Sequence, residues 1–253
     1  MLRGRALIDL ENLGGAMDWP EAGLKVALHL LKPLDSSEIV VVDVGAHRGE
    51  SLSSLSQMCS GPLRYVGLEP NPDAFTDFES VAGALRADNR QITCLQCAAG
   101  PQDGITQFRL TKASAVSGIL QAVNGLSERV PSGDHQIIRE IDVDVLSISS
   151  LVSRFSFAKI DLLKIDTEGY DLEVLRGAQD LLMSQSVEAV LTEAFFVPYR
   201  IGQAYFWDIA SFMSGLGYHF VNLYDARETS QGRLYTGNAL WVSAKAAKAN
   251  DFL

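Results

Sequence analysis

The sequence predicts an α/β fold built on an open, mostly parallel β-sheet. Short apolar runs alternate with amphipathic helical patterns along the chain, which is typical of parallel strands joined by crossover helices. The last two strand-like runs follow each other without a helix between them, which indicates an antiparallel pair at the C-terminal edge of the sheet. With 253 residues, 47% of them hydrophobic, the chain has the length and composition of one large soluble domain.

The first half of the chain begins with a helix over residues 20–32, which a proline opens and in which leucine recurs at helical spacing. Three strongly apolar runs have the length of buried strands, at residues 39–45, 63–70 and 92–100. Two helical patterns separate these strands, at residues 49–59 and 72–87, and a proline starts the second helix. A fourth, accessory strand is expected over residues 104–110.

In the second half, residues 111–136 are rich in Ser, Gly and Ala, and we expect a long irregular connection or lid. Buried or alternating apolar runs predict further strands at residues 138–146, 160–166, 187–195, 218–224 and 239–244. Amphipathic patterns predict helices at residues 147–155, 170–183 and 204–217. In such sheets, ligands bind beyond the carboxyl ends of the strands.

The composition argues against nucleic-acid and membrane partners. The formal net charge is −10, whereas binders of nucleic acid or anionic membranes carry basic patches. No apolar run approaches the ~18 residues that span a bilayer, so we expect a cytoplasmic protein. Cys94 and Cys97 form a C-x-x-C pair, but no second Cys or His pair follows, so we expect reduced thiols and no zinc site.

The first strand ends in the stretch VVDVGAHRG, in which Asp43 and Gly45 lie at the strand tip and Gly49 opens the next helix. A dinucleotide would need the pattern G-x-G-x-x-G, but Ala46 and His47 occupy the middle of this turn. S-adenosyl-L-methionine carries no phosphate, and its amino-acid part suits a D-x-G-x-x-x-G turn in which an acid accepts from the ammonium. The turn therefore favours S-adenosyl-L-methionine.

The tips of the next two strands complete a nucleoside site. Glu69 ends the second strand, where a carboxylate can accept hydrogen bonds from both ribose hydroxyls, and Pro70 and Asn71 follow it. The third strand ends in CLQCAAG, and its tip is expected to face the adenine. Cys97 and Ala98 are the candidates there, and an ordinary strand end of small residues is an equal alternative.

Three carboxylates at neighbouring strand tips are candidates for the chemistry: Asp166, Glu168 and Glu193. A hydroxyl nucleophile needs a general base or a metal that lowers its pKa. Crowded carboxylates raise one another's pKa toward that of a base, and their oxygens also suit Mg²⁺. Asp166 and Glu168 have the alternative of capping the helix that follows, and His47 competes for the role of base.

Five stretches resemble the FkbM-type methyltransferases in their order and spacing: VVDVGAHRGES, YVGLEPNPDAF, CAAGPQDG, IDVDVLSISSL and IDLLKIDTEGYDLEVLRGAQDLL. The resemblance covers residues 39–195 and implies a class I methyltransferase, Rossmann-like fold. That fold has a mostly parallel seven-stranded sheet with an antiparallel C-terminal edge strand and helices on both faces. On this basis, residues 1–36 are an N-terminal helical extension and residues 37–253 are the S-adenosyl-L-methionine-dependent methyltransferase domain.

The resemblance also implies roles for single residues. It places four turn residues at the methionine part of the cofactor: Asp43, Gly45, Ala46 and Gly49. It places Glu69 at the ribose, and the block from Asp166 to Glu168 beside the methyl group. The chain departs from the family at His47, where Asn is common, and at Thr167, where Val is commoner.

The activity that the resemblance implies is O-methylation of a hydroxyl on a sugar, a polyketide or another secondary metabolite. An N-methyltransferase of a small-molecule amine and a nucleoside-binding module without catalysis are the alternatives. The sequence does not name the acceptor, which we expect to be a small molecule or a glycan. A homodimer is a further expectation, because the first 35 residues match nothing in the family and suit an acceptor pocket or a dimer contact.

Overall fold

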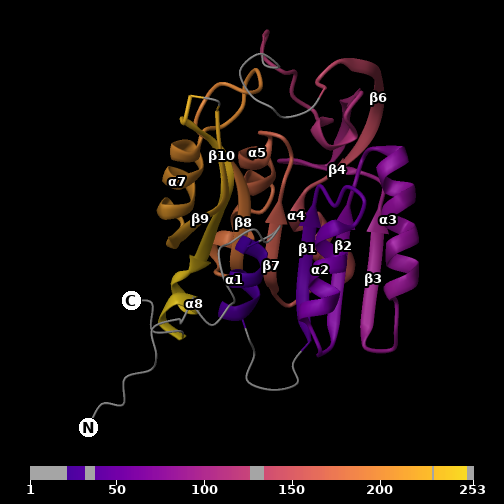
Figure 1. The fold of residues 1–253 in the computed structure, drawn as a ribbon. Helices are drawn as coiled ribbons and strands as arrows, with labels where there is room; N and C mark the ends of the chain where they lie inside the picture. The colour runs from indigo at the N-terminus through magenta and orange to yellow at the C-terminus, as the bar shows by residue number, and fades with distance from the viewer. Residues whose placement is uncertain (1–21, 32–37, 126–133, 230, 250–253) are drawn as a thin grey trace.

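The computed structural model describes residues 22–31, 38–125, 134–229 and 231–249, and its centre is a seven-stranded sheet (Figure 1). The strand order is β3-β2-β1-β7-β8-β10-β9, and only β10 runs antiparallel to its neighbours. The strands are β1 (Ile39–Val44), β2 (Leu63–Leu68), β3 (Arg90–Leu95), β7 (Ile160–Ile165), β8 (Val187–Phe195), β9 (Tyr218–Glu228) and β10 (Leu234–Ser243). The predicted mostly parallel sheet with an antiparallel pair at its C-terminal edge is confirmed.

The strand order reverses between β1 and β7. From β1 the chain adds β2 and β3 on one side, and it then returns to add β7 on the other side. Val44 pairs with Ile165, so the segments that follow β1 and β7 leave the sheet side by side. This reversal is the place where open α/β sheets bind ligands.

Helices cover both faces of the sheet (Figure 1). One face packs against α1 (Ala22–Leu30), α2 (Glu50–Met58), α3 (Pro72–Leu85) and α8 (Ala244–Ala249). The other face packs against α4 (Ile148–Phe155), α5 (Asp171–Arg176), α6 (Gln179–Met183) and α7 (Phe206–Gly215). Side chains alternate between the two cores along a strand, so Val41 belongs to the first and Val42 to the second. Within the described ranges, no helix has the length and apolar character needed to span a membrane.

A second, three-stranded sheet lies beyond the carboxyl ends of the main strands, in the order β4-β6-β5 (Figure 1). Its strands are β4 (Ala98–Ala99), β5 (Gly104–Thr111) and β6 (Ile137–Leu146). The single strand expected over residues 92–100 is wrong, because β3 stops at Leu95 and the chain then crosses to β6. Leu95 pairs with Leu68, the last residue of β2, so no partner remains in the main sheet beyond it.

The helix expected over residues 170–183 is two helices, α5 and α6, which are separated at Gly177 and Ala178. A Cβ on Gly177 would lie 2.1 Å from the backbone oxygen of Gly100, so only glycine allows this close approach. The last two strands are longer than expected, because β9 and β10 form one long antiparallel hairpin. Its pairing extends from Tyr218 opposite Ser243 to Glu228 opposite Leu234. Helix α8 was not expected.

The helix expected over residues 20–32 is present as α1, and its Leu24 and Ala27 are buried in the first core. Residues 1–21, which make up most of the expected extension, lie outside the described residues. The boundary at residues 36 and 37 therefore stays a prediction. Of the expected connection over residues 111–136, the described part includes one 3₁₀ turn at Ser114–Val116, and residues 126–133 lie outside it.

Candidate active site

The turn after β1 requires glycine at two positions for different reasons. Gly45 has φ of 81°, and a Cβ there would lie 2.0 Å from the backbone oxygen of Asp166. Gly49 has φ of 87° and lies against the side chains of Phe78 and Val81 on α3, so it lets this helix, not a ligand, approach. His47 also has a positive φ, of 47°, a conformation in which Asn, Asp and His are the enriched residues after glycine.

Every backbone N–H group of the turn already donates inside the protein. Gly45 and Ala46 donate to the oxygen of Leu68 at 2.9 and 3.0 Å, and Gly49 donates to Ala46 at 2.8 Å. His47 donates to Oε2 of Glu69 at 2.8 Å, and Arg48 donates to Oε2 of Glu50 at 3.0 Å. Residues 45–49 therefore have no N–H group left for a phosphate, which glycine-rich loops bind through such groups.

Glu69 is held rigidly at the tip of β2. Its Oε1 accepts from the N–H of Asn71 at 2.7 Å, its Oε2 accepts from His47, and the residue is 5% exposed. Burial raises the pKa of Glu69 to about 7, although both hydrogen bonds oppose this rise. The Asn71 side chain accepts from the N–H of Asp73 and caps α3, so Asn71 connects the start of this helix to the carboxylate of Glu69.

A cavity of about 390 Å³ opens beyond the tips of β1, β2 and β7. The cavity brings together most of the sequence-predicted site residues: Gly45, Ala46, His47, Glu69, Pro70, Cys97, Ala98, Asp166 and Glu168. Its lining includes Glu69, the small residues of β4 and the acidic residues that follow β7. Asp43, Gly49, Asn71 and Glu193 do not line this cavity.

The expectation that Asp43 reaches a ligand is not met by its position. Its side chain is 0% exposed, because it points into the sheet beneath the turn. Oδ2 accepts from the hydroxyl of Tyr65 at 2.6 Å, and Oδ1 accepts from Nζ of Lys164 at 3.1 Å. Lys164 forms an ion pair with Asp43, and it is Lys164, not Asp43, that lines the cavity.

A second cavity of about 370 Å³ adjoins the first. The two share Ala115, Asp166, Glu168 and Arg227, so a molecule in one lies next to a molecule in the other. The second cavity is also lined by Glu193 and by aromatic and polar side chains from β8, β10 and the loop after β8: Phe195, Tyr199, Tyr235 and Thr236.

The three acidic candidates meet at the junction of the two cavities. Carboxylate oxygens of Asp166, Glu168 and Glu193 lie within 4.8 Å of one another, the one such group in the described chain that could hold a metal ion. Burial, followed by the charges of Asp166 and Glu168, raises the pKa of Glu193 well above its usual value. Oε1 of Glu193 accepts from Thr236 at 3.2 Å, and Oε2 has no hydrogen-bond partner among the described residues. Neither Asp166 nor Glu168 accepts a described backbone N–H of α5, so the capping alternative receives no support.

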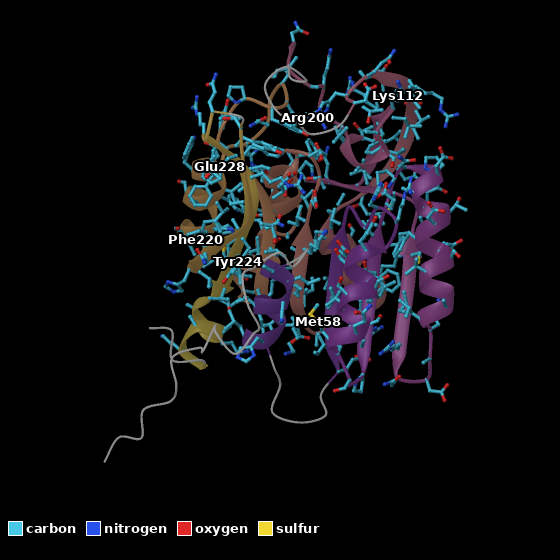
Figure 2. The ribbon with its side chains drawn as sticks, in the orientation of Figure 1. Met58, Lys112, Arg200, Phe220, Tyr224 and Glu228 are labelled. Carbon is cyan, nitrogen blue, oxygen red and sulfur yellow. The ribbon has the colours of Figure 1, made fainter. Side chains whose placement is uncertain are left out.

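Asp171 and Arg200 are site residues that the sequence did not single out. Asp171 is 0% exposed and accepts from the N–H of Glu193 at 3.0 Å and from the hydroxyl of Thr167 at 2.8 Å, which ties the tips of β7 and β8 together. Arg200 is 3% exposed, forms an ion pair with Glu168 and donates to the oxygen of Val116 at 2.7 Å. Figure 2 shows Arg200 on the side of the sheet where the strands end. The signal for Arg200 was an arginine inside the apolar stretch FFVPYRIG, since a buried arginine needs a carboxylate.

His47 links the turn to the 113–118 segment, which closes the cavity from above. Its Nε2 lies 3.0 Å from Oγ of Ser114, and its Nδ1 lies 3.1 Å from Oε1 of Glu50. The hydrogen bond to Glu50 raises the pKa of His47. Both ring nitrogens thus already have partners inside the protein, Ser114 and Glu50, so this geometry gives no support to a base role for His47.

Comparisons with known proteins agree with this architecture. A solved FkbM methyltransferase from Methylobacillus flagellatus KT superposes with a TM-score of 0.52 at 19% identity, over 83% of this chain and 45% of its own. This chain thus spans less than half of that protein's length. An rRNA methylase from Streptococcus thermophilus gives a TM-score of 0.49 at 10% identity, over 90% of this chain and 99% of its own. Magnesium protoporphyrin IX methyltransferase from Synechocystis PCC 6803 with bound SAM gives a TM-score of 0.46 at 14% identity, over 87% of this chain and 76% of its own.

The strand order and the superposition on the FkbM methyltransferase give the class I methyltransferase fold, as expected. No curated protein sequence matches the chain. A family model described as the methyltransferase FkbM domain matches residues 43–220, which is more than half of the 253 residues. That match includes the turn, Glu69 and the acidic tips of β7 and β8. The chain belongs to the FkbM methyltransferase family.

Proposed function

We propose that the chain binds S-adenosyl-L-methionine in the first cavity and methylates a hydroxyl of an acceptor held in the second. The observation that carries this proposal is the turn at residues 45–49, whose N–H groups are all used inside the protein. Such a turn suits a nucleoside without phosphates. Glu69 at the cavity wall offers two carboxylate oxygens to ribose hydroxyls, and Cys97 and Ala98 leave room for an adenine.

The chemistry follows from the junction of the two cavities. Bound S-adenosyl-L-methionine supplies an electrophilic methyl group. The chain has to orient the acceptor hydroxyl toward that group and remove its proton. Glu193 suits the second task, because its raised pKa favours proton uptake and its Oε2 is unpartnered among the described side chains. Glu168 lines both cavities, and because an ion pair with Arg200 fixes its carboxylate, it is placed to orient the hydroxyl.

The first test is calorimetric titration with S-adenosyl-L-homocysteine, the demethylated cofactor. Binding supports the cofactor assignment, and no heat with either form of the cofactor would remove it. Glu69→Ala should weaken binding by about 1–3 kcal/mol, because a charged hydrogen-bond acceptor is lost. Arg48→Ala, which removes an exposed ion pair with Asp77 outside the cavity, is the control and should bind as the unchanged protein does.

The second test decides the acceptor class. Methyl transfer from isotope-labelled cofactor is measured with acceptors paired in structure, one carrying a hydroxyl and one an amine, such as glucose and glucosamine. We expect transfer to oxygen, abolished in Glu193→Gln, and no effect of EDTA. Transfer only to nitrogen would favour an N-methyltransferase, and loss of transfer with EDTA would place Mg²⁺ on the three carboxylates. Cofactor binding without transfer across sugars, polyketides and amines would favour a binding module.

A further inference from the structure

Lys164 and Asp43 form an ion pair in the floor of the first cavity. They are register partners on β7 and β1, and Nζ of Lys164 lies 3.1 Å from Oδ1 of Asp43. The second oxygen of Asp43 accepts from the hydroxyl of Tyr65. Both carboxylate oxygens of Asp43 are therefore engaged, and because the side chain is 0% exposed and does not line the cavity, the carboxylate does not reach a ligand directly.

The ammonium group of Lys164, in contrast, lines the cavity. Its side chain is 13% exposed, and Nζ lies 3.8 Å from Oδ2 of Asp166, whose side chain is 44% exposed. A fixed cation and an exposed carboxylate are thus neighbours at the switch point of the sheet. This pair of opposite charges matches the carboxylate and the ammonium of a free amino acid.

We infer that Lys164 binds the carboxylate of the cofactor's amino-acid part, with Asp43 and Tyr65 acting as positioning residues beneath it. The inference rests on the proposed function, since it concerns the same cofactor. It reverses the role expected for Asp43, which acts on the ligand through Lys164. Asp166, on the other side of Lys164, is left to accept from the ammonium of the ligand.

The chain contains a matched lysine at the opposite end of the same strand. Lys159 precedes β7 and lies 2.6 Å from Oδ1 of Asp161, a buried carboxylate like that of Asp43. Lys159 also pairs with Glu188, is 47% exposed and lies outside the cavity. A Lys159→Met variant therefore removes a comparable salt bridge without touching the proposed site.

The test compares two ligands that differ in one carboxylate. S-adenosyl-L-methionine and its decarboxylated form are titrated by calorimetry into the unchanged protein, Lys164→Met and Lys159→Met. The unchanged protein and Lys159→Met should bind the decarboxylated form at least about tenfold more weakly, the usual effect of losing a charge-assisted hydrogen bond. In Lys164→Met the two affinities should differ by less than about threefold, because the carboxylate has lost its partner.

Two further variants test whether a lone buried charge disturbs the fold and whether a different cationic side chain binds the carboxylate of the ligand. Asp43→Asn combined with Lys164→Met removes both charges, so no buried charge is left alone, and it should show the same convergence of affinities. Arg227→Gln removes the other arginine or lysine that lines the described cavity, and it should keep the tenfold preference. A preference that persists without Lys164, or that disappears with Arg227 instead, overturns the inference. Absence of cofactor binding in the unchanged protein would refute the proposed function itself.

Discussion

If Glu69 binds the cofactor as we propose, its carboxyl group should make cofactor binding sensitive to pH in the neutral range. Burial raises its pKa to about 7, so it is mostly protonated at pH 6 and mostly ionised at pH 8. Only the ionised group can accept hydrogen bonds from two ribose hydroxyls. We therefore expect the affinity for S-adenosyl-L-homocysteine, measured by calorimetry, to rise by about tenfold from pH 6 to pH 8.

The matched variant for this effect is Glu69→Gln, which keeps the shape of the side chain but does not titrate. Its affinity should be lower at pH 8 and nearly constant across the same range. An unchanged slope in this variant would show that another group, such as His47 on the same turn, causes the pH dependence.

Gly45 allows a test of the turn that does not depend on any ligand. In Gly45→Ala, the new Cβ would lie 2.0 Å from a backbone oxygen at a φ of 81°, so the tips of β1 and β7 must separate. We expect the free energy of unfolding to fall by about 2–4 kcal/mol in urea denaturation. Gly83→Ala, in α3, meets only Arg86 at 4.0 Å and should leave stability equal or raise it by about 0.5–1 kcal/mol. Equal stabilities of the two variants would contradict this account.

The sequence predicted the position of a single site residue well where the end of a strand alone determines that position. Gly45 and Glu69 directly follow strands, so reading the strand ends was enough to place them at the cavity. Asp43 also lies on the first strand, but its direction depends on Tyr65 and Lys164, which belong to other strands. A single sequence does not reveal such side-chain partners.

The 113–118 segment between β5 and β6 is held over the cavities by contacts from two distant elements. Ser114 lies against His47, and the oxygen of Val116 accepts from Arg200, which also pairs with Glu168. In Arg200→Met the Glu168 carboxylate, 13% exposed, loses its counter-charge. We expect a loss of about 3–5 kcal/mol in the free energy of unfolding, the usual cost of breaking a buried ion pair.

The control for this prediction is Arg48→Met. Arg48 pairs with Asp77, and both side chains are more than half exposed, so its loss should change stability by less than about 1 kcal/mol. If both variants unfold at the same urea concentration, Arg200 does not hold the segment in place.

Elements were predicted well where their ends carry local signals. Pro72 and the capping side chain of Asn71 fix the start of α3 as the sequence indicates. The break between β3 and β4 and the break at Gly177 have no such signal. The first follows from the length of the neighbouring strand β2, and the second from the backbone of Gly100, which lies far away in the sequence.

For the whole molecule, the alternation of strands and helices predicted the main sheet, because crossover connections leave few arrangements. The second cavity was not predictable in this way. Its walls come from β8, β9, β10 and the segment after β5, and only the three-dimensional fold brings these together. The acidic tips were therefore visible in the sequence, while the volume beside them was not.

The concentration of buried acids also determines how the stability of the whole protein depends on pH. Burial raises the pKa of Asp171 to about 8 and that of Glu69 to about 7, and it raises the pKa of Glu193 as well. At these sites the folded chain binds protons more tightly than the unfolded chain, so the free energy of unfolding falls as pH rises from about 4 to about 8. The hydrogen bond from His47 lowers the pKa of Glu50 to about 2, so the stability that Glu50 contributes is complete above about pH 5 and is lost as the pH falls toward 2.

Without ligand, we therefore expect the thermal midpoint to be highest near pH 5 and to fall by at least about 3–6 °C by pH 8.5, a fall that corresponds to about 1–2 kcal/mol. Differential scanning calorimetry across this range measures the slope. In Asp171→Asn the fall should be smaller, because the amide carries no charge that burial could penalise. A midpoint that stays constant or rises toward pH 8.5 would mean that burial does not raise the pKa values of the acids at the strand tips, and the carboxylate of Glu193 would then lack the raised basicity that suits it to accept a proton.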